Sequence, residues 1–132
     1  MNMKVRDIEK YKRSFLRKLR PDTHGRRRDW ERFVSIRADA DSVSMYPRVL
    51  PGATLLIDRH YTSLQAYRRG EVNIYAVNVN AACKIRYVEA AGDNLVIRPH
   101  NQSYSVEIVP IENGASPGDY VVGRVCHVAV EL

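Results

Sequence analysis

Ser44, Lys84 and Arg86 are candidate residues for catalysis in this chain. A serine hydroxyl is a poor nucleophile unless a neighbouring base removes its proton, and a lysine can be that base when burial keeps its amine neutral. An arginine cannot replace the lysine, because its guanidinium stays protonated in proteins. The chemistry open to Ser44 therefore depends on which cation lies beside it.

The residues that follow Ser44 form a compact pattern. Met45 comes directly after it and Pro47 two residues after that; four residues then separate Pro47 from Gly52, and a short apolar segment ends in Asp58. We expect Met45 to fill the core beneath the serine and Pro47 to fix the exit of the turn. The pattern predicts a tight turn that presents a serine, followed by a buried strand.

This pattern resembles the nucleophile motif of the LexA-type and signal-peptidase-type serine–lysine proteases. Three later segments are similar to strands of the same family in the same order, so the resemblance covers about residues 42–130; these segments are residues 70–77, 95–104 and 121–128. The resemblance implies a LexA-type β domain in which Ser44 is the nucleophile or its relic. Family members of this kind regulate transcription, dimerise through the domain and cleave themselves.

Two departures from the family pattern bear on activity. Counting back from Gly92 places the family's base lysine at Arg86. Lys84 points to the same face of the expected strand, but it is displaced by about 6–7 Å along it, so it is only an alternative base unless a loop differs by two residues. The segment before Ser44 also lacks the Ala-Gly or Cys-Gly bond that self-cleaving members cut. Both departures favour a domain without self-cleavage.

The hydrophobic pattern predicts a mainly β domain of about six or seven short strands. Alternating or compact apolar runs separated by turn residues indicate strands; they occupy residues 54–58, 72–79, 83–88, 95–98, 106–111 and 120–130. In residues 72–79, positions 72, 74 and 76 should face one side of the sheet and positions 75, 77 and 79 the other, and residues 80–82 should form a hairpin turn. Residues 4–20 have the apolar spacing of an amphipathic helix, and residues 33–37 either continue a second helix or open the sheet. We therefore assign residues 1–37 to a basic, partly helical extension and residues 38–132 to the β domain.

The positive charge of the chain lies in that extension. Residues 1–37 carry a net charge of +8 and residues 38–132 one of −2, out of the total of +6. A polyanion such as nucleic acid is the partner that this asymmetry indicates, with Arg26, Arg27 and Arg28 as candidate contacts, although a solvated helix face has the same composition.

Other classes of function are disfavoured. The two cysteines, Cys83 and Cys126, and the scattered histidines lack metal-ligand spacing, so we expect no metal and no cofactor. No apolar run approaches the roughly 20 residues of a membrane span, which favours a cytoplasmic protein without a membrane partner.

The leading hypothesis is a regulatory and dimerisation module of a LexA-like transcriptional regulator. An active autoprotease that uses Ser44 with Lys84 is one alternative, and a UmuD-like accessory protein is another. The sequence also predicts a homodimer, on the argument that the apolar segment 120–130 is an edge strand open to a second copy, although the same segment would also suit the interior of the sheet.

Overall fold

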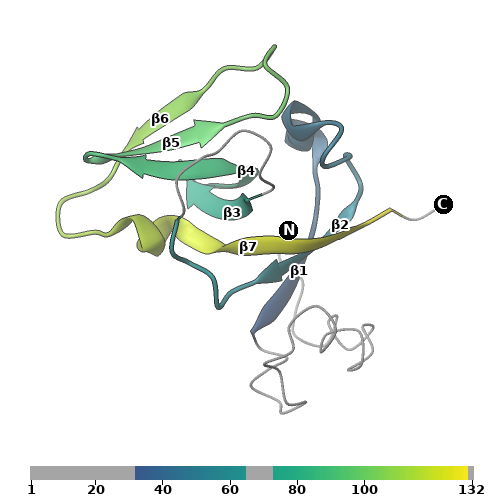
Figure 1. The fold of residues 1–132 in the computed structure, drawn as a ribbon, viewed down its shortest axis with the longest axis horizontal. Coiled ribbons are helices and arrows are strands. Elements are labelled where there is room, and N and C mark those ends of the chain that lie inside the picture. Colours follow the sequence, from purple (N-terminus) through teal and green to yellow (C-terminus); the bar gives the residue numbers. More distant parts are fainter. Residues whose placement is uncertain (1–31, 65–72, 131–132) are drawn as a thin grey trace.

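The structure is a computed structural model, and it describes residues 32–64 and 73–130. The strands in these residues form one antiparallel sheet. The strand order is β1-β2-β7-β3-β4-β5-β6 (Figure 1). The strands are β1 (Phe33–Arg37), β2 (Thr54–Asp58), β3 (Ile74–Val79), β4 (Ala82–Ala91), β5 (Asn94–Arg98), β6 (Glu107–Pro110) and β7 (Val121–Ala129). Two short 3-10 helices, η1 (Ala40–Met45) and η2 (Pro117–Tyr120), connect them. The prediction of a mainly β domain is confirmed.

Local sequence signals account for several of these elements. The predicted strand at residues 54–58 coincides with β2. The expected hairpin after β3 is present, and both Asn80 and Ala81 have positive φ angles, of 50° and 61°. Two successive residues with positive φ give a tight turn whose twist matches that of the two strands it joins. The register therefore places Val79 opposite Ala82 and Tyr75 opposite Arg86.

The first strand settles the alternative left open for residues 33–37. β1 pairs with β2, with Phe33 opposite Asp58 and Arg37 opposite Thr54. The sheet thus begins at Phe33, inside the range 1–37 that the sequence assigned to the extension. The helix expected at residues 4–20 and the candidate contacts Arg26, Arg27 and Arg28 lie outside the described residues.

The last strand occupies a different place from the one expected. β7 lies between β2 and β3, so the expectation of an edge strand is wrong, and β1 and β6 form the edges of the sheet. Gly123 helps to explain the central position. A Cβ at this residue would lie 2.8 Å from the carbonyl carbon of Asp58 and 2.9 Å from the Cα of Arg59, so only glycine allows this close approach to the end of β2.

Side chains of alternate residues divide the core between the two faces of the sheet. In β3, Ile74 and Ala76 belong to one cluster, whereas Tyr75, Val77 and Val79 belong to the other. This alternation is the one that the sequence predicted, and it follows from the two-residue period of a strand. The first cluster also contains Met45, together with Leu55 and Ile57 of β2. The turn that carries Ser44 is therefore anchored to the core.

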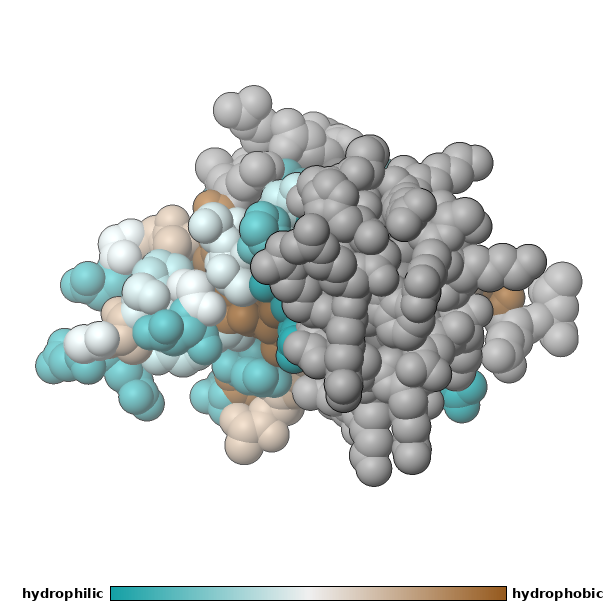
Figure 2. Space-filling model, turned by 90° about the horizontal axis from the view of Figure 1, so that it is seen from below, coloured by the Kyte–Doolittle hydropathy of each residue, from teal (hydrophilic) through white to brown (hydrophobic). Residues whose placement is uncertain are grey.

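The described surface is mixed in polarity. Figure 2 shows mostly hydrophilic and intermediate residues on the described part of the face seen from below, with hydrophobic residues between them. Among the residues with described placement, no helix combines the length and apolar character that crossing a membrane would require.

Candidate functional site

A capped 3-10 turn presents Ser44. Asp39 is the N-cap of η1, and its side chain accepts a hydrogen bond of 3.1 Å from the backbone N–H of Asp41. Such a cap satisfies a donor that the first turn of a helix would otherwise leave without a partner. At the other end of η1, Met45 is fully buried in the core. The turn is thus fixed at both ends, which sets the position of the serine between them.

The remaining motif residues close the loop between β1 and β2. Tyr46–Pro47 is a cis peptide bond at the exit of η1. Gly52 has a φ of +86°, a conformation that favours glycine, and its N–H donates to the carbonyl of Ala38 at 2.8 Å. These residues hold the loop in shape, and no chemistry needs to be assigned to them.

Asp58 lies at the opposite end of the β1–β2 pair from this loop. Its carboxylate is fully buried and accepts two hydrogen bonds from Arg32, of 2.7 Å from Nε and 2.8 Å from Nη2. The backbone N–H of His60 donates a third, of 3.1 Å. Asp58 is therefore a structural carboxylate at the end of β2. The loop that contains η1 lies at the other end of the β1–β2 pair.

Ser44 itself is almost completely buried, with 1% of its surface exposed. Its Oγ donates a hydrogen bond of 3.0 Å to the backbone carbonyl of Asp41, one turn earlier in η1. Its own carbonyl accepts a hydrogen bond of 2.8 Å from the N–H of Asn101, in the loop after β5. The serine proton is thus directed at a backbone oxygen, which is too weak a base to remove it.

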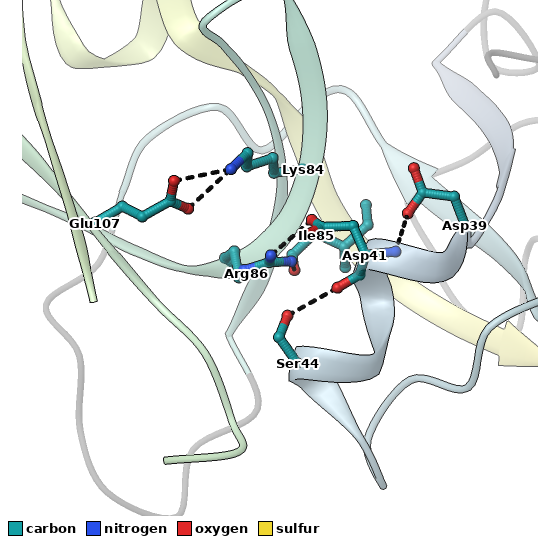
Figure 3. Close-up of polar contacts among 7 residues, drawn as sticks. All are labelled: Asp39, Asp41, Ser44, Lys84, Ile85, Arg86 and Glu107. Atoms are coloured by element: carbon teal, nitrogen blue, oxygen red, sulfur yellow. Dashed lines mark hydrogen bonds and ion pairs between the residues drawn. The ribbon is translucent and has the colours of Figure 1, made fainter. Parts of the chain in front are cut away.

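Arg86 reaches the same turn from β4. Its side chain is 6% exposed, and its guanidinium donates from Nη2 to Asp41 Oδ2 at 2.6 Å and from Nη1 to the carbonyl of Ile85 at 2.8 Å. Asp41 therefore binds both residues, Ser44 through its backbone and Arg86 through its side chain (Figure 3). The position where the family resemblance puts the base holds a permanent cation.

Lys84 is turned towards a different partner. Its Nζ donates to both carboxylate oxygens of Glu107 on β6, at 2.8 Å and 3.0 Å. Figure 3 shows the lysine side chain extending away from Ser44 towards that strand. The structure thus separates the two candidate bases, with Arg86 at Asp41 and Lys84 at Glu107. An ammonium that donates to a carboxylate has no free lone pair with which to accept a serine proton.

Sequence reasoning missed the two carboxylates to which these cations donate hydrogen bonds. Asp41 had a usable signal, because it stands three residues before Ser44, and residues at that spacing share a face of a 3-10 helix. Glu107 had no local signal, because it meets Lys84 only through the pairing of β4 with β5 and of β5 with β6. Long-range pairing of this kind is not readable from a single sequence.

The cysteines and possible metal ligands add no second site. Both Cys83 and Cys126 are free thiols. Burial, and then the negative charge of Asp39, raise the pKa of the Cys83 thiol above its ordinary value. Within residues 32–64 and 73–130, no group of three His, Cys, Asp or Glu side chains is arranged to hold a metal ion.

Comparison with known proteins does not assign this chain to a family. No protein-family model matches this chain, and no curated protein matches it either.

Proposed function

We propose that this chain is a regulatory and dimerisation module of a LexA-like transcriptional regulator that does not cleave itself. The motif around Ser44 supports the family, and a mainly β fold agrees with it. The observation that carries the loss of activity is the contact of Arg86 with Asp41. A guanidinium held by a carboxylate beside the serine turn can neither take nor shuttle the Ser44 proton.

The state of Ser44 points the same way. Activation would require its hydroxyl to leave the carbonyl of Asp41 and to find a base within about 2.6–3.2 Å. The charged groups at this turn are the guanidinium of Arg86 and the carboxylate of Asp41, and the carboxylate already accepts a hydrogen bond from the guanidinium. In this proposal Ser44 is a relic of a nucleophile, and its hydroxyl now donates a hydrogen bond within η1.

The alternative dyad of Ser44 with Lys84 has less support. Lys84 would have to abandon both hydrogen bonds to Glu107 and move along β4 to reach the serine. Such a move breaks an ion pair whose lysine side chain is largely buried, with 19% exposed. We therefore rank the alternative second and include it in the test.

Incubation of the purified full chain at about pH 10, near the ordinary pKa of lysine, tests the proposal. We expect intact mass after prolonged incubation, measured by mass spectrometry. Ser44→Ala is the control for background hydrolysis, and Lys84→Ala tests the alternative base. A fragment that the original chain forms and both variants lack would establish the alternative dyad. A fragment absent only from Ser44→Ala would also contradict the proposal, because Ser44 would then be active without Lys84.

Two partners belong to the same proposal. The first is a second copy of the chain. Among the described strands, β7 pairs with β3 as far as Arg124 but continues along β2 to Ala129, and Val130 beyond it is 53% exposed. The end of β7 is therefore the surface we assign to the dimer. Sedimentation of the same sample at micromolar concentration measures it, and a clean monomer would contradict it.

The second partner is nucleic acid. Residues 1–37 carry a charge of +8, and Arg26, Arg27 and Arg28 concentrate part of it. We expect weak, sequence-independent affinity that falls steeply with salt, because the release of counterions from phosphates drives such binding.

A further inference from the structure

The strand β6 forms one edge of the sheet, and β5 is its only neighbour among the described strands (Figure 1). The N–H of Ile111, directly after β6, donates to the carbonyl of Asp93 at 2.8 Å, so the backbone of this residue is turned towards β5. Because backbone groups alternate in direction along an antiparallel strand, those of Glu107 and Val109 also face β5. The N–H and the carbonyl of Ile108 therefore point away from the sheet.

Apolar side chains line one face of the sheet along this edge. Val106, Ile108 and Pro110 share that face, because side chains alternate along a strand, and all three are exposed, Ile108 by 66% and Val106 by 47%. Val96 of β5 lies opposite Ile108 and is half-buried, so it continues the apolar surface across the sheet. We call Val106, Ile108 and Pro110, with their outward backbone groups, the β6 edge.

The β6 edge has little protection against pairing with another chain. Sheet edges are usually protected by a charge, a proline or a bulge. The charge of β6 is that of Glu107, which lies on the face opposite to Ile108 and accepts hydrogen bonds from Lys84. Pro110 removes one N–H at the end of the strand, and the pairing of β5 with β6 has no register shift. The outward N–H and carbonyl of Ile108 thus remain in the position that a further strand needs.

The segment that carries this edge is acidic. Residues 99–123 contain three acidic side chains and neither lysine nor arginine. Asp93 and Glu112 are both exposed and adjoin each other beyond Pro110, because Asp93 accepts the N–H of the residue directly before Glu112. At the other end of the strand, residues 101–106 carry no charge. The negative charge of the β6 edge therefore lies at its Pro110 end.

The cations of the neighbouring strands do not reverse this charge. Lys84 of β4 donates to Glu107, and Arg98 of β5 donates to Glu89 at 2.8 Å. Each of these ion pairs contributes no net charge. The exposed carboxylates beyond Pro110 therefore set the sign of the charge at that end.

We propose that the β6 edge binds an extended segment of a partner protein in which basic residues precede alternating apolar residues. Such a segment adds a strand antiparallel to β6, as every described pair of strands in this sheet is antiparallel. In that direction its N-terminal end lies beside Asp93 and Glu112, so lysine or arginine belongs there. The inference goes beyond the proposed function, since it involves neither the serine turn nor the residues before β1.

Strand geometry fixes which groups of the partner segment face β6. Residues directly opposite each other in an antiparallel pair place their side chains on the same face, and in a hydrogen-bonded pair they exchange both N–H···O bonds. Ile108 turns its backbone groups outward. The partner residues that pack on the apolar face beside Ile108 are therefore the ones whose N–H groups donate to β6.

Fluorescence anisotropy of the full chain with a labelled synthetic peptide tests the proposal. The peptide consists of lysines followed by alternating valine and threonine. Valine packs on the apolar face, so we expect methylation of the valine nitrogens to abolish binding. Methylation of the threonine nitrogens is the matched control, and it should leave binding intact because those nitrogens face away from β6.

Variants of the chain test the same surface from the other side. Ile108→Lys places a cation in the apolar row and should weaken affinity for the lysine peptide about tenfold, which is the scale of a central interface contact. Leu50→Lys is the matched control, because Leu50 is also an exposed apolar residue, at 36%, but lies in the loop between η1 and β2. Glu112→Gln should weaken affinity by about two- to fivefold at low salt, as expected for an exposed ion pair.

Several results would overturn the proposal. These are no binding by the original chain, equal affinity for the two methylated peptides, and equal affinity of Ile108→Lys and Leu50→Lys. A peptide with glutamates in place of the lysines that binds as tightly would overturn the basic character of the partner. If the original chain sediments as an oligomer that Ile108→Lys dissociates and Leu50→Lys does not, a second copy occupies the edge, and the partner protein is overturned.

Discussion

Two arginine–aspartate pairs in this domain bury opposite partners. In the pair of Arg32 with Asp58, the carboxylate is completely buried and the arginine side chain is 11% exposed. In the pair of Arg86 with Asp41, the guanidinium is buried and the carboxylate is 53% exposed. The first pair closes the end of β2 with two hydrogen bonds, whereas the second rests on one hydrogen bond at the serine turn.

The difference decides which half of each pair the fold depends on. A charge left buried without its partner costs far more than one left in water, because water replaces the lost contact only at the surface. The β2 end should therefore depend on its cation, and the serine turn on its anion.

Removal of Arg32 should produce the largest effect. Arg32→Ala strips two charge-assisted hydrogen bonds from a carboxylate without exposed surface, and we expect the free energy of unfolding to fall by about 3–5 kcal/mol. Urea denaturation followed by circular dichroism measures it. Asp58→Asn leaves Arg32 without its anion, but the side chain of Arg32 still reaches solvent with 11% of its surface, so this variant should cost less. If Asp58→Asn costs as much as Arg32→Ala, the buried carboxylate is not the source of the effect.

The serine turn should show the reverse order. Asp41→Asn leaves the buried guanidinium of Arg86 with the carbonyl of Ile85, and we expect a loss of about 1–3 kcal/mol. Arg86→Met removes the buried charge and leaves Asp41 in water, so it should change the free energy of unfolding by less than about 1 kcal/mol. The same denaturation experiment compares the two variants. A larger loss in Arg86→Met than in Asp41→Asn would break the comparison.

Much of the fold was readable from local patterns. The alternation in β3 assigned each side chain to its face, and the bounds of β2 were correct, because both follow from the period and composition of a strand. The place of β7 was not readable. An apolar terminal strand suits an edge or an interior position equally, and its interior place depends on contacts of Gly123 with residues far away in the sequence.

The site was readable in part for a similar reason. The resemblance to the serine–lysine protease motif singled out Ser44, Lys84 and Arg86. The partners that define their chemistry were missed, because Asp41 lies 45 residues before Arg86, and Glu107 lies 23 residues after Lys84. Contacts between segments so far apart depend on the sheet order, which a single sequence does not fix.

The smallest expected effect concerns the second carboxylate of the serine turn, Asp39, and the thiol of Cys83. Burial and then the charge of Asp39 raise the pKa of Cys83 above 9.0. The unfolded chain therefore loses this proton at a lower pH than the folded domain does. The contribution of the protonated thiol to stability is fully present below about pH 9 and is lost as the pH rises through the folded pKa.

Alkylation by iodoacetamide measures this pKa, because only the thiolate reacts. In a Cys126→Ser background, so that Cys83 is the only thiol, we expect the midpoint of the rate against pH to lie above 9.0. Asp39→Asn removes the charge but keeps a side chain that caps helices equally well, so it should lower the midpoint without loosening η1. Burial is the larger cause, so the midpoint of this variant should remain above 9.0. An equal midpoint with and without the charge of Asp39 would show that this carboxylate does not act on Cys83 and that burial alone raises the pKa of the thiol.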